Sequence, residues 1–183
     1  MSARRRGALW LAAVLALAMA GALPAGAADS PSLEYAVKAN YLYKFGPFVD
    51  WPAEAFAGPA APFSVCVAGE DPFGAALDEA IKGQTIQGRP VAVRRLTAVV
   101  GDNGCQVLYL GRSRTQTTAD ALRAVRTAPV LTVTDERLGA TGGIVHFVLR
   151  DGRVRFAINP TAAQLAGLTL SSKLLALSVG PGR

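Results

Sequence analysis

Histidine is almost absent from this chain of 183 residues: His146 is the only one, and there are only two cysteines and two methionines. Zinc and copper sites draw on clustered His and Cys side chains, and no cluster with metal-ligand spacing occurs here. The serine-hydrolase pattern G-x-S-x-G is missing, as are the phosphate-binding patterns G-x-G-x-x-G and the P-loop. The sequence therefore predicts no bound metal, no cofactor and no enzyme of these classes.

Charge is also sparse, because only 17% of the residues are Asp, Glu, Lys or Arg. The chain has 19 basic and 13 acidic residues, a net charge of +6, but Arg4, Arg5 and Arg6 lie at its extreme N-terminus. A chain without them would keep 16 basic against 13 acidic residues, a net charge of +3. So small an excess predicts no nucleic-acid partner.

One long apolar run is present, from Ala8 to Leu23. It follows the three arginines and precedes the small residues Ala25-Gly26-Ala27, which is the pattern of a secretory signal peptide. The alternative is an uncleaved anchor, but the run is shorter than the roughly 20 residues of a membrane-spanning helix. We expect cleavage after Ala27, a single mature domain over residues 28–183 without membrane insertion, and a location in the periplasm.

Cys66 and Cys105 both belong to the expected mature chain. An even number of cysteines in an oxidising compartment is compatible with a disulfide bond. The alternative is two separate buried thiols, because a bond requires Cα atoms within about 7 Å of each other. The fold must decide between them.

Helical and alternating apolar patterns follow one another along the chain. They predict a helix over 33–49, a strand over 63–69, a helix over 73–81, strands over 89–96 and 105–110, a helix over 118–126, strands over 130–134, 144–149 and 154–158, and a helix over 161–177. Before the second of these helices, Asp71 is a good N-cap and Pro72 a good first residue.

Strands that alternate with helices indicate an α/β fold. We expect a single domain with a mostly parallel sheet, helices on both of its faces, and an antiparallel C-terminal hairpin at one edge. The hairpin is indicated by Asp151-Gly152 between two alternating segments. Strands 63–69 and 105–110 would bring Cys66 and Cys105 together if they lie side by side.

Several segments, taken in order, resemble the YfiR-like family of periplasmic proteins. They are K-A-N-Y-L-Y-K-F-G-P-F-V-D-W-P (38–52), F-S-V-C-V-A-G-E-D-P-F-G (63–74), G-R-P-V-A-V-R-R-L (88–96), C-Q-V-L-Y-L (105–110), V-L-T-V-T-D (130–135), G-G-I-V-H-F (142–147) and the stretch from R-V-R-F-A-I-N-P to K-L-L-A-L (153–177). The resemblance covers about residues 34–178.

This resemblance implies an α/β fold and a negative regulator, not an enzyme. Such a protein holds back an inner-membrane diguanylate cyclase by binding its periplasmic part, and release raises cyclic di-GMP and promotes biofilm. Cys66 and Cys105 match a family pair that forms a disulfide. The family's second cysteine pair is missing, since no cysteine follows Cys105, so redox switching that depends on two bonds is not expected.

Two groups of residues are candidates for binding. Tyr43 and Trp51 fall outside the helical stripe of their aromatic neighbours and are candidate partner contacts. Glu70 and Asp71 follow a strand at the edge where α/β sheets bind ligands, although Asp71 can instead serve only as a helix cap. Four other carboxylates are expected in solvent: Glu34, Glu54, Asp78 and Glu79.

Three functions remain open. The first is a regulatory protein that binds an inner-membrane diguanylate cyclase or sensor kinase, either as a monomer or as a homodimer. The second is a periplasmic sensor of a small molecule, with its pocket near residues 69–73. The third is an enzyme with an unfamiliar site around Asp71, Asp135 or His146.

Overall fold

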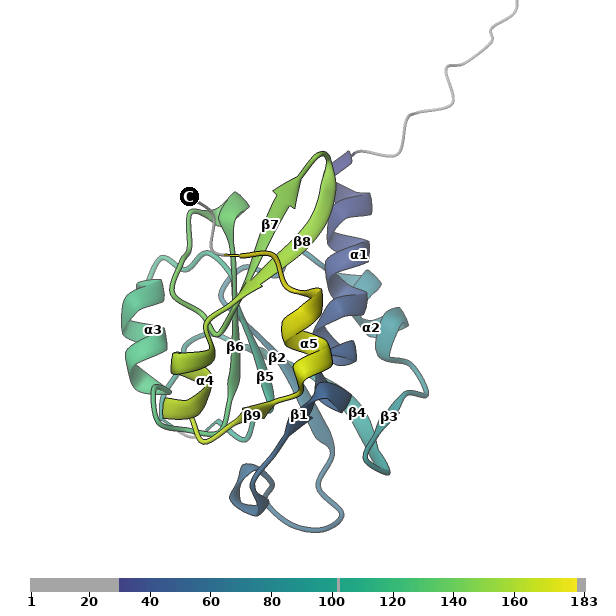
Figure 1. Cartoon of the computed structure of the whole chain (residues 1–183), viewed down its shortest axis with the longest axis vertical. Helices are drawn as coiled ribbons and strands as arrows, with labels where there is room; N and C mark the ends of the chain where they lie inside the picture. The colour runs from purple at the N-terminus through teal and green to yellow at the C-terminus, as the bar shows by residue number, and fades with distance from the viewer. Residues whose placement is uncertain (1–29, 102, 181–183) are drawn as a thin grey trace, which may run out of the picture.

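The computed structural model describes residues 30–101 and 103–180, which form two sheets and the helices around them (Figure 1). The α-helices are α1 (Ser30–Lys44), α2 (Ala75–Ile81), α3 (Thr118–Ala124), α4 (Pro160–Leu165) and α5 (Ser172–Leu177). The strands are β1 (Val49–Asp50), β2 (Phe63–Ala68), β3 (Thr85–Ile86), β4 (Arg89–Leu96), β5 (Val107–Leu110), β6 (Leu131–Asp135), β7 (Val145–Arg150), β8 (Arg153–Ile158) and β9 (Thr169–Leu170). Short 3₁₀ turns are η1 (Gly46–Phe48), η2 (Ala53–Ala55) and η3 (Glu136–Leu138).

The large sheet has the strand order β3-β4-β2-β5-β6-β7-β8. The five strands β4, β2, β5, β6 and β7 are parallel, while β3 and β8 run antiparallel at the two edges. The predicted α/β class, the mostly parallel sheet and the edge hairpin are thereby confirmed. At the hairpin turn Asp151 and Gly152 both have positive φ, as a tight turn between two strands requires.

Helices cover both faces of this sheet, with α1, α2 and α5 on one side and α3 on the other (Figure 1). Strand β2 shows the consequence, because all six of its residues are buried. Val65 and Val67 belong to the core under α1 and α2, whereas Cys66 and Ala68 belong to the core under α3. A strand buried on both faces reads as a continuous apolar run, which is why the segment was recognisable in the sequence.

The predicted single helix over 161–177 was wrong, because the chain forms α4 and α5 with β9 between them. Gly167, at φ +69°, turns the backbone out of the helical conformation. The side chains of Asn159 and Ser171 each accept a hydrogen bond from a backbone N–H in the first turn of α4 and of α5. Strand β9 then pairs with β1 in a separate two-stranded antiparallel sheet.

The predicted cap of the second helix was also wrong. Helix α2 begins at Ala75, and its N-cap is Gly74. The Asp71 carboxylate instead accepts hydrogen bonds from the backbone N–H groups of Phe73 (2.7 Å) and Gly74 (3.2 Å), so it closes the turn that precedes the helix. An Asp-Pro pair is compatible with a helix cap and with a turn before a helix.

Two glycines close the gap beyond the ends of β2 and β5. The Glu70 N–H donates to the Arg112 carbonyl at 2.7 Å, and the Gly111 N–H donates to the Ala68 carbonyl at 2.9 Å. A Cβ atom on Gly111 would lie 2.1 Å from the Glu70 carbonyl oxygen, and one on Gly69 would lie 2.3 Å from the Arg112 carbonyl oxygen. Backbone therefore fills the point at which doubly wound sheets often hold a ligand.

The substitution Gly111→Ala should lower the free energy of unfolding by about 1–3 kcal/mol, because the new methyl group meets backbone that cannot rotate away. Urea denaturation at neutral pH measures the effect. Gly58→Ala is the matched control, since a Cβ there would have no heavy atom within 4 Å. Equal stabilities of the two variants would contradict the close approach of the two segments.

Candidate functional site

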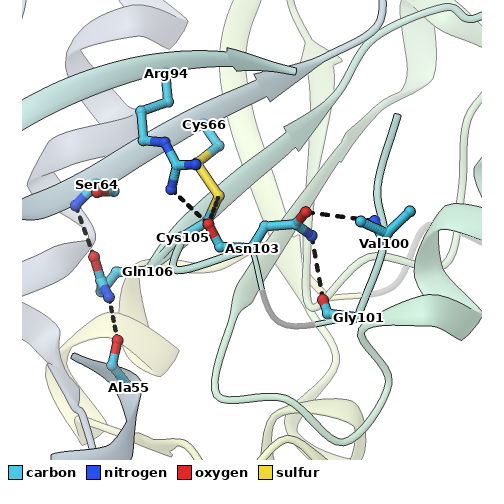
Figure 2. The surroundings of a disulfide bond; sticks show 9 residues. All are labelled: Ala55, Ser64, Cys66, Arg94, Val100, Gly101, Asn103, Cys105 and Gln106. Atoms are coloured by element: carbon cyan, nitrogen blue, oxygen red, sulfur yellow. Dashed lines mark hydrogen bonds between the residues drawn. A yellow bond between two sulfur atoms is a disulfide. The ribbon is translucent and has the colours of Figure 1, made fainter. Parts of the chain in front are cut away.

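A disulfide joins Cys66 of β2 to Cys105, which lies two residues before β5 (Figure 2). Their Cα atoms are 5.9 Å apart, and 39 residues separate them along the chain. Both residues are buried in the core under α3. The pairing agrees with the family resemblance and with the side-by-side position of β2 and β5.

Polar contacts hold the chain around the two sulfur atoms (Figure 2). Arg94 lies opposite Cys66 on β4 and donates a hydrogen bond to the Asn103 carbonyl at 2.5 Å. The Asn103 amide group donates to the Gly101 carbonyl at 3.2 Å. Hydrogen bonds therefore connect Arg94, Asn103 and Gly101 close to the disulfide.

A buried ion pair lies on the opposite face of the sheet. Lys38 of α1 is 0% exposed, and its Nζ atom is 2.5 Å from Glu34 Oε1 and 2.6 Å from Asp135 Oδ2. Asp135 is the last residue of β6 and is also fully buried. Buried charges require such partners, because the protein interior solvates them poorly. The pair therefore fixes α1 against the carboxyl end of β6.

Further donors complete this cluster. The Tyr109 hydroxyl donates to Asp135 Oδ2 at 3.0 Å, the Arg137 N–H donates to Asp135 Oδ1 at 3.0 Å, and Arg137 Nε is 2.6 Å from Glu34 Oε2. Two cations thus balance two carboxylates. Burial, and then the nearby Asp135 carboxylate, raise the pKa of Tyr109, so its phenol stays protonated and acts as a donor.

Sequence reasoning missed this cluster and placed Glu34 in solvent, which was wrong, since Glu34 is buried. One signal was present: Glu34 and Lys38 are four residues apart on a predicted helix, and side chains at that spacing meet. The same spacing is common on exposed helix faces. Only the position of Asp135, distant in sequence, shows that this pair points inward.

The three residues proposed for an unfamiliar enzyme site lie in separate environments. Asp135 belongs to the ion cluster beside α1, whereas His146 Nδ1 is 3.0 Å from Thr134 Oγ1, on the other face of the sheet. Asp71 Oδ2 accepts a hydrogen bond from Arg95 Nε at 2.8 Å. Burial lowers the pKa of His146, which favours its neutral form. The geometry groups none of these side chains for acid–base catalysis.

Glu70 and Asp71, the candidate ligand residues, point to different surroundings. Glu70 is exposed and lines a polar cavity of about 710 Å³ together with Arg112, Ser113 and Arg114. Asp71 is engaged by Arg95 and by the turn before α2. Of the two, only Glu70 lines this cavity, and its role in ligand binding stays a prediction.

Tyr43 and Trp51, the candidate partner contacts, are both half-buried and pack against the core under α1. The Trp51 ring meets Phe63 edge-on at 5.4 Å, and its Nε1–H donates to the Gly46 carbonyl at 3.2 Å. Each aromatic ring thus has an anchored part and a part left at the surface. Their role in binding stays a prediction.

Within residues 30–101 and 103–180, no group of three or more His, Cys, Asp or Glu side chains is arranged to hold a metal ion. Over the same residues, no helix combines the length and apolar character needed to cross a membrane. The predicted signal peptide, residues 1–27, lies outside the described part of the chain.

Comparison with models of protein families gives a match over residues 35–179, to the family described as YfiR/HmsC-like. The chain belongs to the YfiR/HmsC-like family. The match includes both cysteines of the disulfide and both partners of the Lys38–Asp135 pair. Among curated proteins, no match to this YfiR/HmsC-like chain is found.

Replacing Lys38 by Met should lower the free energy of unfolding by about 3–5 kcal/mol, because the buried Asp135 carboxylate would lose its counter-charge. Urea denaturation at pH 7 measures this. Lys44→Met is the matched control on the same helix, and as an exposed change it should cost no more than about 0.5 kcal/mol. Similar losses for the two variants would contradict a buried ion pair.

Cys66→Ser should lower the free energy of unfolding by about 3–4 kcal/mol, because the unfolded chain gains conformational entropy when a loop of this length is no longer closed. Thermal melting with and without reductant checks the result. Reductant should destabilise the wild-type protein and leave Cys66→Ser unchanged. If the oxidised wild type and the variant melt at the same temperature, the disulfide does not contribute to stability.

Proposed function

We propose that this protein is a periplasmic negative regulator that holds back an inner-membrane diguanylate cyclase by binding the periplasmic part of that enzyme. The observation that carries the proposal is membership of the YfiR/HmsC-like family over residues 35–179. Binding keeps cyclic di-GMP low, and release of the cyclase promotes biofilm. The alternative partner is another inner-membrane signalling protein, a sensor kinase.

The arrangement of the described side chains supports a binding role. The buried charges neutralise one another in the Lys38 cluster, and Asp71, Asp135 and His146 are engaged in separate places. A disulfide enclosed in the core suits a protein that works in an oxidising compartment. Under this proposal residues 1–27 direct export, residues 28–183 form the regulator, and Tyr43 and Trp51 contribute to the partner surface.

A second function, a small-molecule sensor, is favoured by one observation. The cavity beside Glu70 lies at the carboxyl edge of the sheet, where α/β proteins bind ligands, and Arg112 and Arg114 also line it. Thermal shift against a panel of envelope metabolites tests this function. A ligand that raises the melting temperature of the wild type but not of Glu70→Ala would support it, and a panel without any shift would contradict it.

The proposed regulation is tested in cells that lack the gene. Loss of the protein should raise cyclic di-GMP, and a plasmid copy should restore the low level. A copy without residues 1–27 is the control, since it stays in the cytoplasm and should not restore it. Crosslinking of a C-terminally tagged protein should recover a membrane diguanylate cyclase.

Unchanged cyclic di-GMP after deletion would contradict the proposal. If crosslinking recovers a sensor kinase instead, the regulatory role stands and the kinase, not a cyclase, is the partner.

A further inference from the structure

Helix α1 exposes two large apolar side chains on its outer side. Leu33 is 64% exposed and Val37 is 39% exposed, and one helical turn separates them. The inner side of the same helix is fully covered, with Ala39 and Leu42 both at 0%. A surface helix normally presents polar residues to water, so these two exposed apolar side chains make this side of α1 a candidate contact surface.

These two side chains form one wall of a groove. Leu33 and Val37 lie on one side, and Leu149 and Val154 of the β7–β8 hairpin lie on the other, around a space of about 640 Å³. Figure 1 shows the hairpin tip beside the N-terminal half of α1. Arg137, Arg153, Glu34 and Gly152 also line the groove. We define these eight residues as the α1–hairpin groove.

We propose that the α1–hairpin groove receives an amphipathic helix with acidic flanks, supplied by the partner protein. Leu33, Val37 and the half-buried Tyr41 follow one another at intervals of four residues. Side chains at that spacing form a ridge, and such ridges pack into the grooves of a second helix. This inference rests on the proposed regulatory function and adds the surface and the chemistry of the partner.

A helix suits the site better than an added strand. Strand β8 is the edge of the sheet, but it carries exposed Arg153 and Arg155, and charged residues on an edge strand oppose further strand pairing. Its far half is already used, because the Val179 N–H donates to the Phe156 carbonyl at 2.9 Å.

The charge at the rim indicates acidic flanks. Arg153 is exposed and has no ion-pair partner among residues 30–101 and 103–180, and Arg137 is exposed beside its contact with Glu34. Glu34 is buried and already engaged by Lys38 and Arg137, so it presents little negative charge to a ligand. Acidic residues beside an apolar stripe would complement this rim.

A second copy of this chain suits the groove less well. In a two-fold contact the same patch meets itself, so one cationic rim would face the other. Like charges placed opposite each other weaken such a contact. The occupant proposed here is therefore the periplasmic part of the membrane partner, and self-association is an outcome of the test.

The test restores deletion cells with variants of the full chain. Val37→Glu should leave cyclic di-GMP high, whereas Leu165→Glu should restore the low level, because Leu165 is 51% exposed on α4 and lies outside the groove. Equal periplasmic amounts and melting temperatures of the two variants show that both fold. With the purified periplasmic domain of the captured cyclase, Val37→Glu should weaken binding at least about tenfold.

Charge variants test the acidic flank. Arg153→Glu should weaken binding and make the affinity less dependent on salt. Arg153→Lys keeps the positive charge, so it should retain the wild-type affinity and salt dependence. If Val37→Glu restrains the cyclase normally, the groove is not the partner-binding surface, and the proposed function still stands. A wild-type dimer that Val37→Glu converts to a monomer would overturn the helical partner in favour of a second copy. Unchanged cyclic di-GMP in the deletion cells would overturn the proposed function and this inference together.

Discussion

The fully buried lysine of α1 is the constraint on which the arrangement of this protein depends. An isolated ammonium group inside a protein is strongly unfavourable, with an idealised transfer cost of the order of 20 kcal/mol, and only close counter-charges offset it. Lys38 obtains one carboxylate from its own helix and one, Asp135, from 97 residues further along the chain. The position of α1 is thereby tied to the end of β6. The side of α1 that faces water, with its two exposed apolar side chains, follows from that attachment.

Much of the fold could be predicted from local patterns. Strands buried on both faces appear as apolar runs, and their alternation with helices predicts the parallel sheet. Where the prediction failed, the cause was either a contact between segments distant in sequence or the backbone conformation of one residue. The C-terminal segment has continuous helical spacing, yet Gly167 and the pairing of β9 with β1 divide it. No pattern within or beside residues 161–177 predicts that Val49 lies opposite Leu170.

The candidate sites were predictable to a smaller extent. The family resemblance and the side-by-side strands identified the disulfide partners, Cys66 and Cys105. The rule for α/β sheets led to Glu70, which lines a cavity at that edge and whose role in ligand binding stays a prediction, but the rule could not show that two glycines bring backbone close together there. Periodicity locates a helix without saying which side the rest of the chain will cover. The exposed Leu33 and the buried Glu34 are neighbours in sequence and have opposite surroundings for that reason.

The sheet separates the two features that hold the molecule together. The sulfur atoms lie in the core under α3, while the ion cluster lies in the core under α1. Reduction would therefore loosen the α3 side first and leave the attachment of α1 intact. Local opening exposes backbone to proteases in proportion to how often a segment unfolds. Loss of the disulfide would therefore make the backbone around Cys66 and Cys105 more accessible to proteases than the backbone around Lys38.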